Sequence, residues 1–288
     1  MKIPKYWSRA TAENTDRDGR KVAIACWRWS DAGRDEAHQS ALAAAQRALA
    51  CLLRGERLDR YSYGQMPLRE EVLQTVEDAR GEPFLAVSRN RYGAIILNTA
   101  RVAFLDLDFP AANVGVQLKR LFARLLGRSV ASADAQREAE IWSRLEQFVA
   151  GNPEHGFRVY RTCAGVRAMA THALFDPASP ATLGMLRQLG SDPLYVRLCQ
   201  VQECFRARLT PKPWRCGCPS NPASWPRDGA DEQSRFEAWE AGYTAAQEGY
   251  ATCRWLGTLG VEHVLPEVQQ IIRLHDQMTR CHDKLTLA

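Results

Sequence analysis

Residues 104–109, FLDLDF, place two aspartates one residue apart inside an apolar run. Burying a charged side chain without a partner is costly, so the acids and the apolar residues cannot share one environment. A β-strand separates them, because alternate residues of a strand point to opposite faces. Asp106 and Asp108 then share one face, and the opposite, core-facing side carries Leu105, Leu107 and Phe109. The run therefore predicts a strand with one buried face and one acidic face.

The rest of the chain alternates between strand-like and helix-like segments. β-Favouring residues predict strands at 21–29, 83–90, 92–98 and 101–109, a hairpin within 156–177 that turns at Gly165, and a strand beginning at Cys204. Apolar periodicity and end signals predict helices at 34–55, 68–81, 111–127, 133–151, 178–190, 192–201, 231–249 and 264–280. The strands between 83 and 109 are expected to form an antiparallel meander. This order predicts an α+β fold with a largely antiparallel sheet flanked by helices.

Three regions are expected: an N-terminal strand and helix region packed on the core (1–80), a catalytic core (81–217), and a loop with C-terminal helices (218–288). The 288-residue chain is 45% hydrophobic and 25% charged, which is ordinary for a soluble globular protein. The N-terminus has no apolar signal segment, and no apolar run approaches the roughly eighteen residues that cross a bilayer. A soluble, cytoplasmic protein without a membrane partner is expected.

Positive charge is concentrated in residues 156–227. Ten arginines and lysines stand there against three acids, so the segment carries +7 while the whole chain carries +5. Such an excess is what an anionic ligand selects. Residues suited to phosphate are Arg158, Arg206, Arg208, Lys212 and Arg215. Trp214 can stack on a base, although a solvated basic strand with a buried tryptophan is the alternative for this stretch.

The acidic pair has two interpretations. Two carboxylates about 7 Å apart along a strand can share hard divalent cations, Mg²⁺ or Mn²⁺, which suits phosphoryl transfer. Alternatively, Asp108 caps a helix that starts after Pro110. No glycine-rich phosphate loop of the GxxxxGK[ST] or GxGxxG type occurs in the chain.

The nine cysteines form no disulfide ladder and are expected to be reduced. The stretch WRCGC at 214–218 raises the alternative of a zinc site. Its further ligands would come from Cys199, Cys204, or the adjacent Cys281 and His282.

The order of these features resembles the catalytic core of the archaeo-eukaryotic primase superfamily over about residues 84–216. The likeness rests on the hhhDhD strand, the glycine-turn hairpin ending in ATH at 170–172, and the basic strand leading to Lys-Pro. It implies an RRM-like, primase-type core in which Asp106 and Asp108 bind metal and His172 contacts the nucleotide's phosphates. The family's further acid on a later strand has no obvious match, because Asp176 is too close to His172; Glu203 is a candidate.

We therefore expect a metal-dependent nucleotidyltransferase of primase-polymerase type that acts on nucleoside triphosphates and nucleic acid. One alternative is a non-catalytic nucleic-acid- or nucleotide-binding protein that uses the basic segment 156–227. Another is a protein-interaction or uncharged-ligand domain in which the acids are structural.

Overall fold

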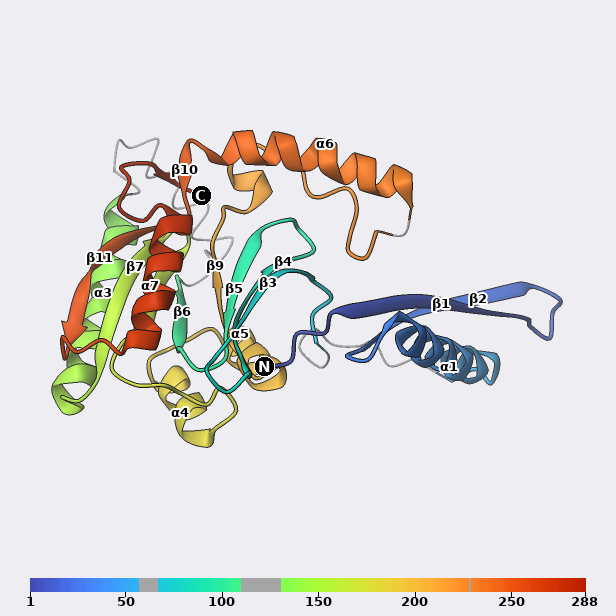
Figure 1. Cartoon of the computed structure of the whole chain (residues 1–288), viewed down its shortest axis with the longest axis horizontal. Helices are drawn as coiled ribbons and strands as arrows, with labels where there is room; N and C mark the ends of the chain where they lie inside the picture. The colour runs from blue at the N-terminus through green and yellow to red at the C-terminus, as the bar shows by residue number, and fades with distance from the viewer. Residues whose placement is uncertain (57–66, 110–130, 228) are drawn as a thin grey trace.

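The protein, described by a computed structural model over residues 1–56, 67–109, 131–227 and 229–288, has a mixed α+β fold. Two four-stranded antiparallel sheets and the helices around them form a body, and an N-terminal arm extends from it (Figure 1). The predicted α+β class with largely antiparallel pairing is confirmed.

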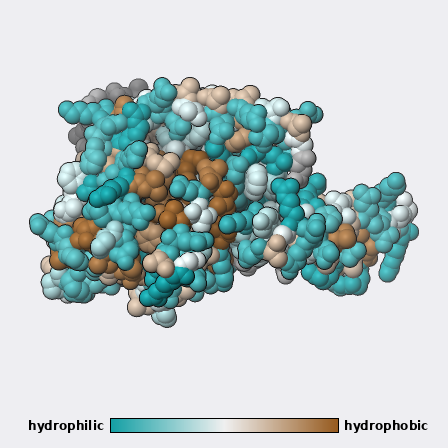
Figure 2. Space-filling model, in the orientation of Figure 1, coloured by the Kyte–Doolittle hydropathy of each residue, from teal (hydrophilic) through white to brown (hydrophobic). Residues whose placement is uncertain are grey.

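The arm is a two-stranded hairpin with one helix packed across it. Strand β1 (Tyr6–Thr15) pairs with β2 (Lys21–Ser30), and α1 (Arg34–Leu53) covers one face of the pair. Its small core contains Ala12, Val22, Ile24, Cys26, Ala45, Leu49 and Leu53. The arm's visible surface is mainly hydrophilic, and the hydrophobic surface in the same view gathers over the body (Figure 2). The predicted strand and helix of this region are confirmed, and β1 was not predicted.

Sheet I has the strand order β3-β4-β5-β9. Its strands are β3 (Glu71–Glu77), β4 (Pro83–Arg89), β5 (Ile95–Thr99) and β9 (Phe205–Arg208). The predicted helix at 68–81 is wrong, because residues 71–77 of this segment form β3 and pair with β4. Gly81 belongs to the hairpin turn that follows, where the Asp78 carboxylate accepts hydrogen bonds from the Arg80 and Glu82 amides.

Sheet II has the strand order β11-β7-β8-β6. Its strands are β6 (Phe104–Asp108), β7 (Gly156–Thr162), β8 (Gly165–Ala170) and β11 (Cys253–Gly260). The expected meander is wrong at its third strand: β5 pairs with β9 on that edge, and β6 crosses to pair with β8. Gly165 permits this approach, since a Cβ there would lie 2.4 Å from the Leu107 carbonyl oxygen.

Helices α3 (Ala131–Gly151) and α7 (Pro266–Thr279) lie against opposite faces of sheet II (Figure 1). Helices α4 (Pro180–Gln188) and α5 (Pro193–Gln202) pack against each other, and α6 (Ala230–Gln247) contacts the turn between β4 and β5. A short parallel pair is formed by β10 (Tyr250–Ala251) and β12 (Thr286–Leu287). The helix predicted at 111–127 lies outside the described residues. Within the described ranges, no helix combines the length and apolar character needed to span a bilayer.

One continuous core joins the sheets to the helices. Leu105 and Leu107 of β6 are buried in it, as the alternation predicted, and Asp106 and Asp108 turn to the opposite face. That face is partly covered by α7, whose His275 packs against Phe104. The end of the strand that carries the acids is left uncovered by α7 and opens into the pocket described next.

Candidate functional site

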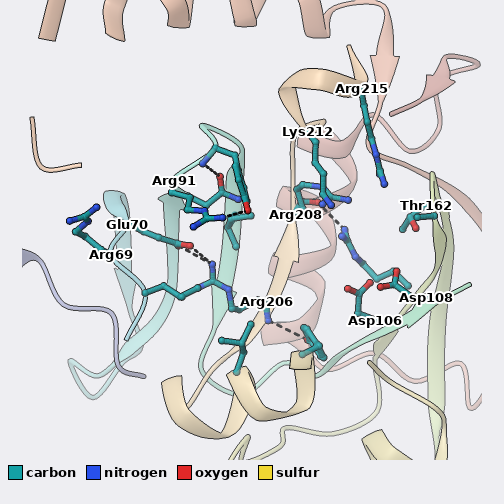
Figure 3. Close-up of a pocket in the computed structure, with 18 of the residues that line it drawn as sticks. Arg69, Glu70, Arg91, Asp106, Asp108, Thr162, Arg206, Arg208, Lys212 and Arg215 are labelled. Atoms are coloured by element: carbon teal, nitrogen blue, oxygen red, sulfur yellow. Dashed lines mark hydrogen bonds and ion pairs between the residues drawn. The ribbon is translucent and has the colours of Figure 1, made fainter. Parts of the chain in front are cut away.

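A pocket lies where the edge strands of the two sheets, β6 and β9, come side by side (Figure 3). Two hydrogen bonds join the elements around it. The Asp192 amide donates to the Asp106 carbonyl oxygen at 2.9 Å, and Arg167 donates to the Arg208 carbonyl oxygen at 2.9 Å. The cavity measures about 540 Å³, within the range of small-ligand sites. Residues about a hundred positions apart in sequence therefore face each other.

The acidic wall is formed by Asp106 and Asp108. Among the residues that the structure describes, no side chain or backbone amide donates a hydrogen bond to either carboxylate. The pKa of Asp108 rises to about 6, because desolvation and then the charge of Asp106 disfavour the ionised form. The positive charge of Lys212 offsets only part of this effect. The negative charge of the pair is therefore only partly compensated by its described neighbours.

The basic wall is formed by Arg208 on β9 and by Lys212 and Arg215 in the following loop (Figure 3). Two of its donors, Arg208 Nε and Arg215 Nη1, are buried and have no hydrogen-bond partner among the described residues. Burial and the neighbouring charges of Arg167 and Arg215 lower the pKa of Arg208 to about 10. Burial and the charge of Arg208 also lower the pKa of Lys212. Crowded cations with unused donors suit an anionic ligand.

Helix α6 holds the basic loop in place. The Tyr243 hydroxyl donates to the Pro211 carbonyl oxygen at 2.6 Å, and the Cys218 amide donates to the Pro213 carbonyl oxygen at 2.9 Å. Cys216 and Cys218 pack in an apolar cluster with Phe236, Trp239 and Tyr243. In the described part of the chain, neither cysteine of WRCGC joins a group of three metal-ligating side chains. Their visible role is to anchor the loop that carries Lys212 and Arg215.

Arg167 is a pocket residue that the sequence did not single out. It lies on β8 directly opposite Asp106, is buried, and lines the pocket. One of its guanidinium nitrogens lies 3.1 Å from His275 Nε2. Since arginine only donates, His275 Nε2 accepts, and its Nδ1–H is left to donate to Asp276 at 3.0 Å. Burial lowers the pKa of His275 to about 4, so the ring is neutral and fixes the guanidinium beside Asp106.

Asp192 is a third acid near the pair, although it does not line the pocket. It caps α5 by accepting a hydrogen bond from the Tyr195 amide at 2.8 Å, and its charge contributes to the raised pKa of Asp108. The Ser-Asp-Pro sequence signals a helix cap and gives no sign of the neighbouring acids. Glu203, the candidate from sequence, lies at the other end of α5 and pairs with Lys2 at 2.5 Å.

His172 does not line the pocket. The strand that was expected to carry it to 176 ends at Ala170, so His172 lies beyond the sheet. Its Nδ1 accepts a hydrogen bond from the Gly156 amide at 3.0 Å, and its ring packs 4.5 Å from that of His155. Desolvation lowers its pKa. The predicted convergence of His172 with the two aspartates is therefore wrong in this structure.

Two of the predicted phosphate-binding arginines are engaged inside the protein. Arg158 donates to Asp276 at 2.6 Å and lies under α7, outside the pocket. Arg206 lines the pocket, and its guanidinium bonds the two Glu70 oxygens at 2.7 and 2.9 Å. Both charges are thus neutralised by buried or half-buried carboxylates.

No protein-family model, curated protein or solved structure matches this chain. The side chains of the site therefore indicate what chemistry it can support. Asp106 and Asp108 offer hard oxygen ligands, which Mg²⁺ and Mn²⁺ prefer. Their open face and the raised pKa of Asp108 fit a site that would gain from a divalent cation.

Proposed function

We propose that this pocket binds a nucleoside triphosphate with Mg²⁺ or Mn²⁺ and that the protein is a nucleotidyltransferase of primase-polymerase type. The observation that carries the proposal is the pairing of two unpartnered carboxylates with buried, unused arginine donors across one cavity. A metal-bound polyphosphate supplies what each wall lacks: a cation for the acids and oxygen acceptors for the arginines. An RRM-like, primase-type core is part of this proposal, supported by the order of acidic strand, hairpin and basic strand.

Each wall has a distinct role in the proposed reaction. Asp106 and Asp108, with Asp192 close by, hold the cation. Arg208, Lys212 and Arg215 bind the phosphate oxygens, and Arg167 adds positive charge beside Asp106. When bound, the divalent cation stabilises the charge that builds up on the phosphates.

The proposed reaction is attack of a strand's 3′-hydroxyl on the α-phosphate of the triphosphate. A phosphodiester bond forms, the bond to the β-phosphate breaks, the hydroxyl proton is released to water, and pyrophosphate leaves. The residues of the pocket contribute by positioning and charge, which suits phosphoryl transfer.

The alternative of a non-catalytic protein that binds nucleic acid through the whole of segment 156–227 has less support. Several arginines of that segment are spent on internal ion pairs: Arg158 with Asp276, Arg161 with Glu138, Arg206 with Glu70, and Arg227 with Glu71. The charge left for a ligand is concentrated at the pocket.

The test is titration of Mn²⁺ with and without a nucleoside triphosphate by calorimetry, joined to an assay of labelled nucleotide incorporation. The wild type should bind the triphosphate only with metal, and the double variant Asp106→Asn with Asp108→Asn should lose both binding and incorporation. Asp176→Asn is the matched control, because Asp176 lies in a turn outside the pocket and should change nothing. Equal binding and incorporation by the double variant would overturn the proposal.

A further inference from the structure

Aromatic and cationic side chains gather at the mouth of the pocket. We call Arg91, Tyr92, Lys212 and Trp214 the mouth cluster. The rings of Tyr92 and Trp214 meet edge to face with centroids 5.2 Å apart. The Arg91 guanidinium lies 4.5 Å from the Tyr92 ring, and the Lys212 ammonium lies 5.6 Å from the Trp214 ring. Trp214 remains 49% exposed, so core packing does not account for its position.

The turn that carries Tyr92 is rigidly built. The Asn90 side chain accepts hydrogen bonds from the Tyr92 amide at 3.0 Å and the Ala94 amide at 3.1 Å. Gly93 has a φ of 98°, and a Cβ there would lie 1.9 Å from the Trp239 ring of α6. The turn between β4 and β5 is therefore pressed against that helix.

Trp214 is held by the same helix. It lies in a single 3₁₀ turn, Pro213–Arg215, between the Tyr243 hydrogen bond to Pro211 and the buried Cys216. The backbone that carries both aromatic residues is thus fixed by contacts with α6. A large exposed ring on rigid backbone is what a stacking platform needs, since little conformational freedom is lost on binding.

The charge around this platform selects the ligand. Neither Arg91 nor Lys212 forms an ion pair with an acid in the described part of the chain. An exposed tryptophan flanked by unneutralised cations suits a chain that carries both flat bases and phosphates. We propose that the mouth cluster binds single-stranded nucleic acid, with a base stacked on Trp214 and Arg91 on the backbone. This inference rests on the proposed function, because it places a strand next to the nucleotide pocket.

The test measures binding of a labelled twelve-residue oligothymidylate by fluorescence anisotropy, without divalent metal. Trp214→Ala should weaken binding by about 5- to 150-fold, the range of stacking one base on an aromatic ring. Trp214→Phe should keep most of the affinity. Trp255→Ala is the matched control: Trp255 is 40% exposed on β11, beside Arg158 and remote from the mouth cluster, and its loss should leave binding unchanged.

A second oligonucleotide separates stacking from charge. On an abasic strand of the same length, wild type and Trp214→Ala should bind equally weakly, because no base is left to stack. Unchanged oligothymidylate binding by Trp214→Ala would overturn the inference, as would an equal loss on the abasic strand. Calorimetry with Mn²⁺ and triphosphate on the same samples separates the two proposals. Trp214→Ala should keep that binding, whereas its absence in the wild type would overturn the proposed function alone.

Discussion

Two carboxylate sites lie at the two ends of the Arg167–His275 contact, Asp276 on α7 at one end and Asp106 with Asp108 on β6 at the other. Asp276 accepts hydrogen bonds from Arg158 at 2.6 Å, Tyr160 at 2.7 Å and His275 at 3.0 Å. Burial alone would raise its pKa, but these hydrogen bonds and the Arg158 charge hold it well below its usual range. Asp108 has no such donors, and its pKa rises to about 6. The fold provides hydrogen-bond donors to the first carboxylate and, among the described residues, none to the second.

Asp276 also belongs to a group of three side chains that could act as metal ligands. The ligand atoms of Asp276, Cys281 and His282 lie within 4.8 Å of one another. The Asp276 oxygens are already bonded to Arg158 and Tyr160, and the Arg158 guanidinium lies 3.4 Å from His282 Nε2. A cation there would meet a fixed positive charge. Proximity of ligand atoms is therefore weaker evidence for a metal site than the absence of competing donors.

The largest expected effect is a loss of stability on removing Asp276, the carboxylate that accepts hydrogen bonds from three side chains. Asp276→Ala leaves Arg158, Tyr160 and His275 without their acceptor and should lower the free energy of unfolding by about 3–5 kcal/mol. Urea denaturation measures it. Asp283→Ala removes an exposed ion pair with Arg280 and should cost less than about 1 kcal/mol. A loss at Asp276 no larger than at Asp283 would remove the distinction between the two sets of carboxylates.

The next effect is on metal affinity as a function of pH. Asp108 must be ionised to bind a cation, and its pKa is raised to about 6, so affinity should fall as pH drops through that value. One pH unit below the pKa, about a tenth of the carboxylate is ionised, so Mn²⁺ affinity at pH 5 should be roughly tenfold weaker than at pH 7.5. Calorimetry across this range checks it. A flat profile in the wild type, matching that of Asp108→Asn, would contradict the expectation.

Local patterns in the sequence predicted much of the acidic wall. Period-two alternation placed Asp106 and Asp108 opposite Leu105 and Leu107, because side-chain direction in a strand depends only on neighbouring residues. Local patterns failed where pairing with another strand decides the secondary structure. Residues 71–77 favour a helix by composition, yet they form β3 because β4 offers a pairing edge.

The rest of the pocket could not be predicted, because it depends on which strands pair and on which charged side chains contact each other. Nothing local indicates that β6 leaves β5 for β8, and only that pairing puts Arg167 opposite Asp106. Likewise, Arg206 and Arg208 look equivalent in sequence. Their difference comes from Glu70, a residue more than a hundred positions away that neutralises Arg206 alone. Long-range charge pairing, rather than residue type, decides which arginine is neutralised.

The smallest expected effect is a gain in stability on replacing Asp108, opposite in sign to the loss on replacing Asp276. The pKa of Asp108 is raised above its ordinary 3.8, so its ionised form penalises the metal-free fold, increasingly as pH rises toward about 6 and fully above it. Asp108→Asn should therefore raise the Tm at pH 7.5 without metal, by about 1–3 °C once solvent screening is allowed for. The gain should vanish near pH 4, where the wild-type carboxyl is largely protonated.

Scanning calorimetry with and without Mn²⁺ measures the Tm at both pH values, and only the wild type should be stabilised by the metal. A variant that melts below the wild type at pH 7.5 without metal would show that the fold depends on the Asp108 charge, as it does on that of Asp276.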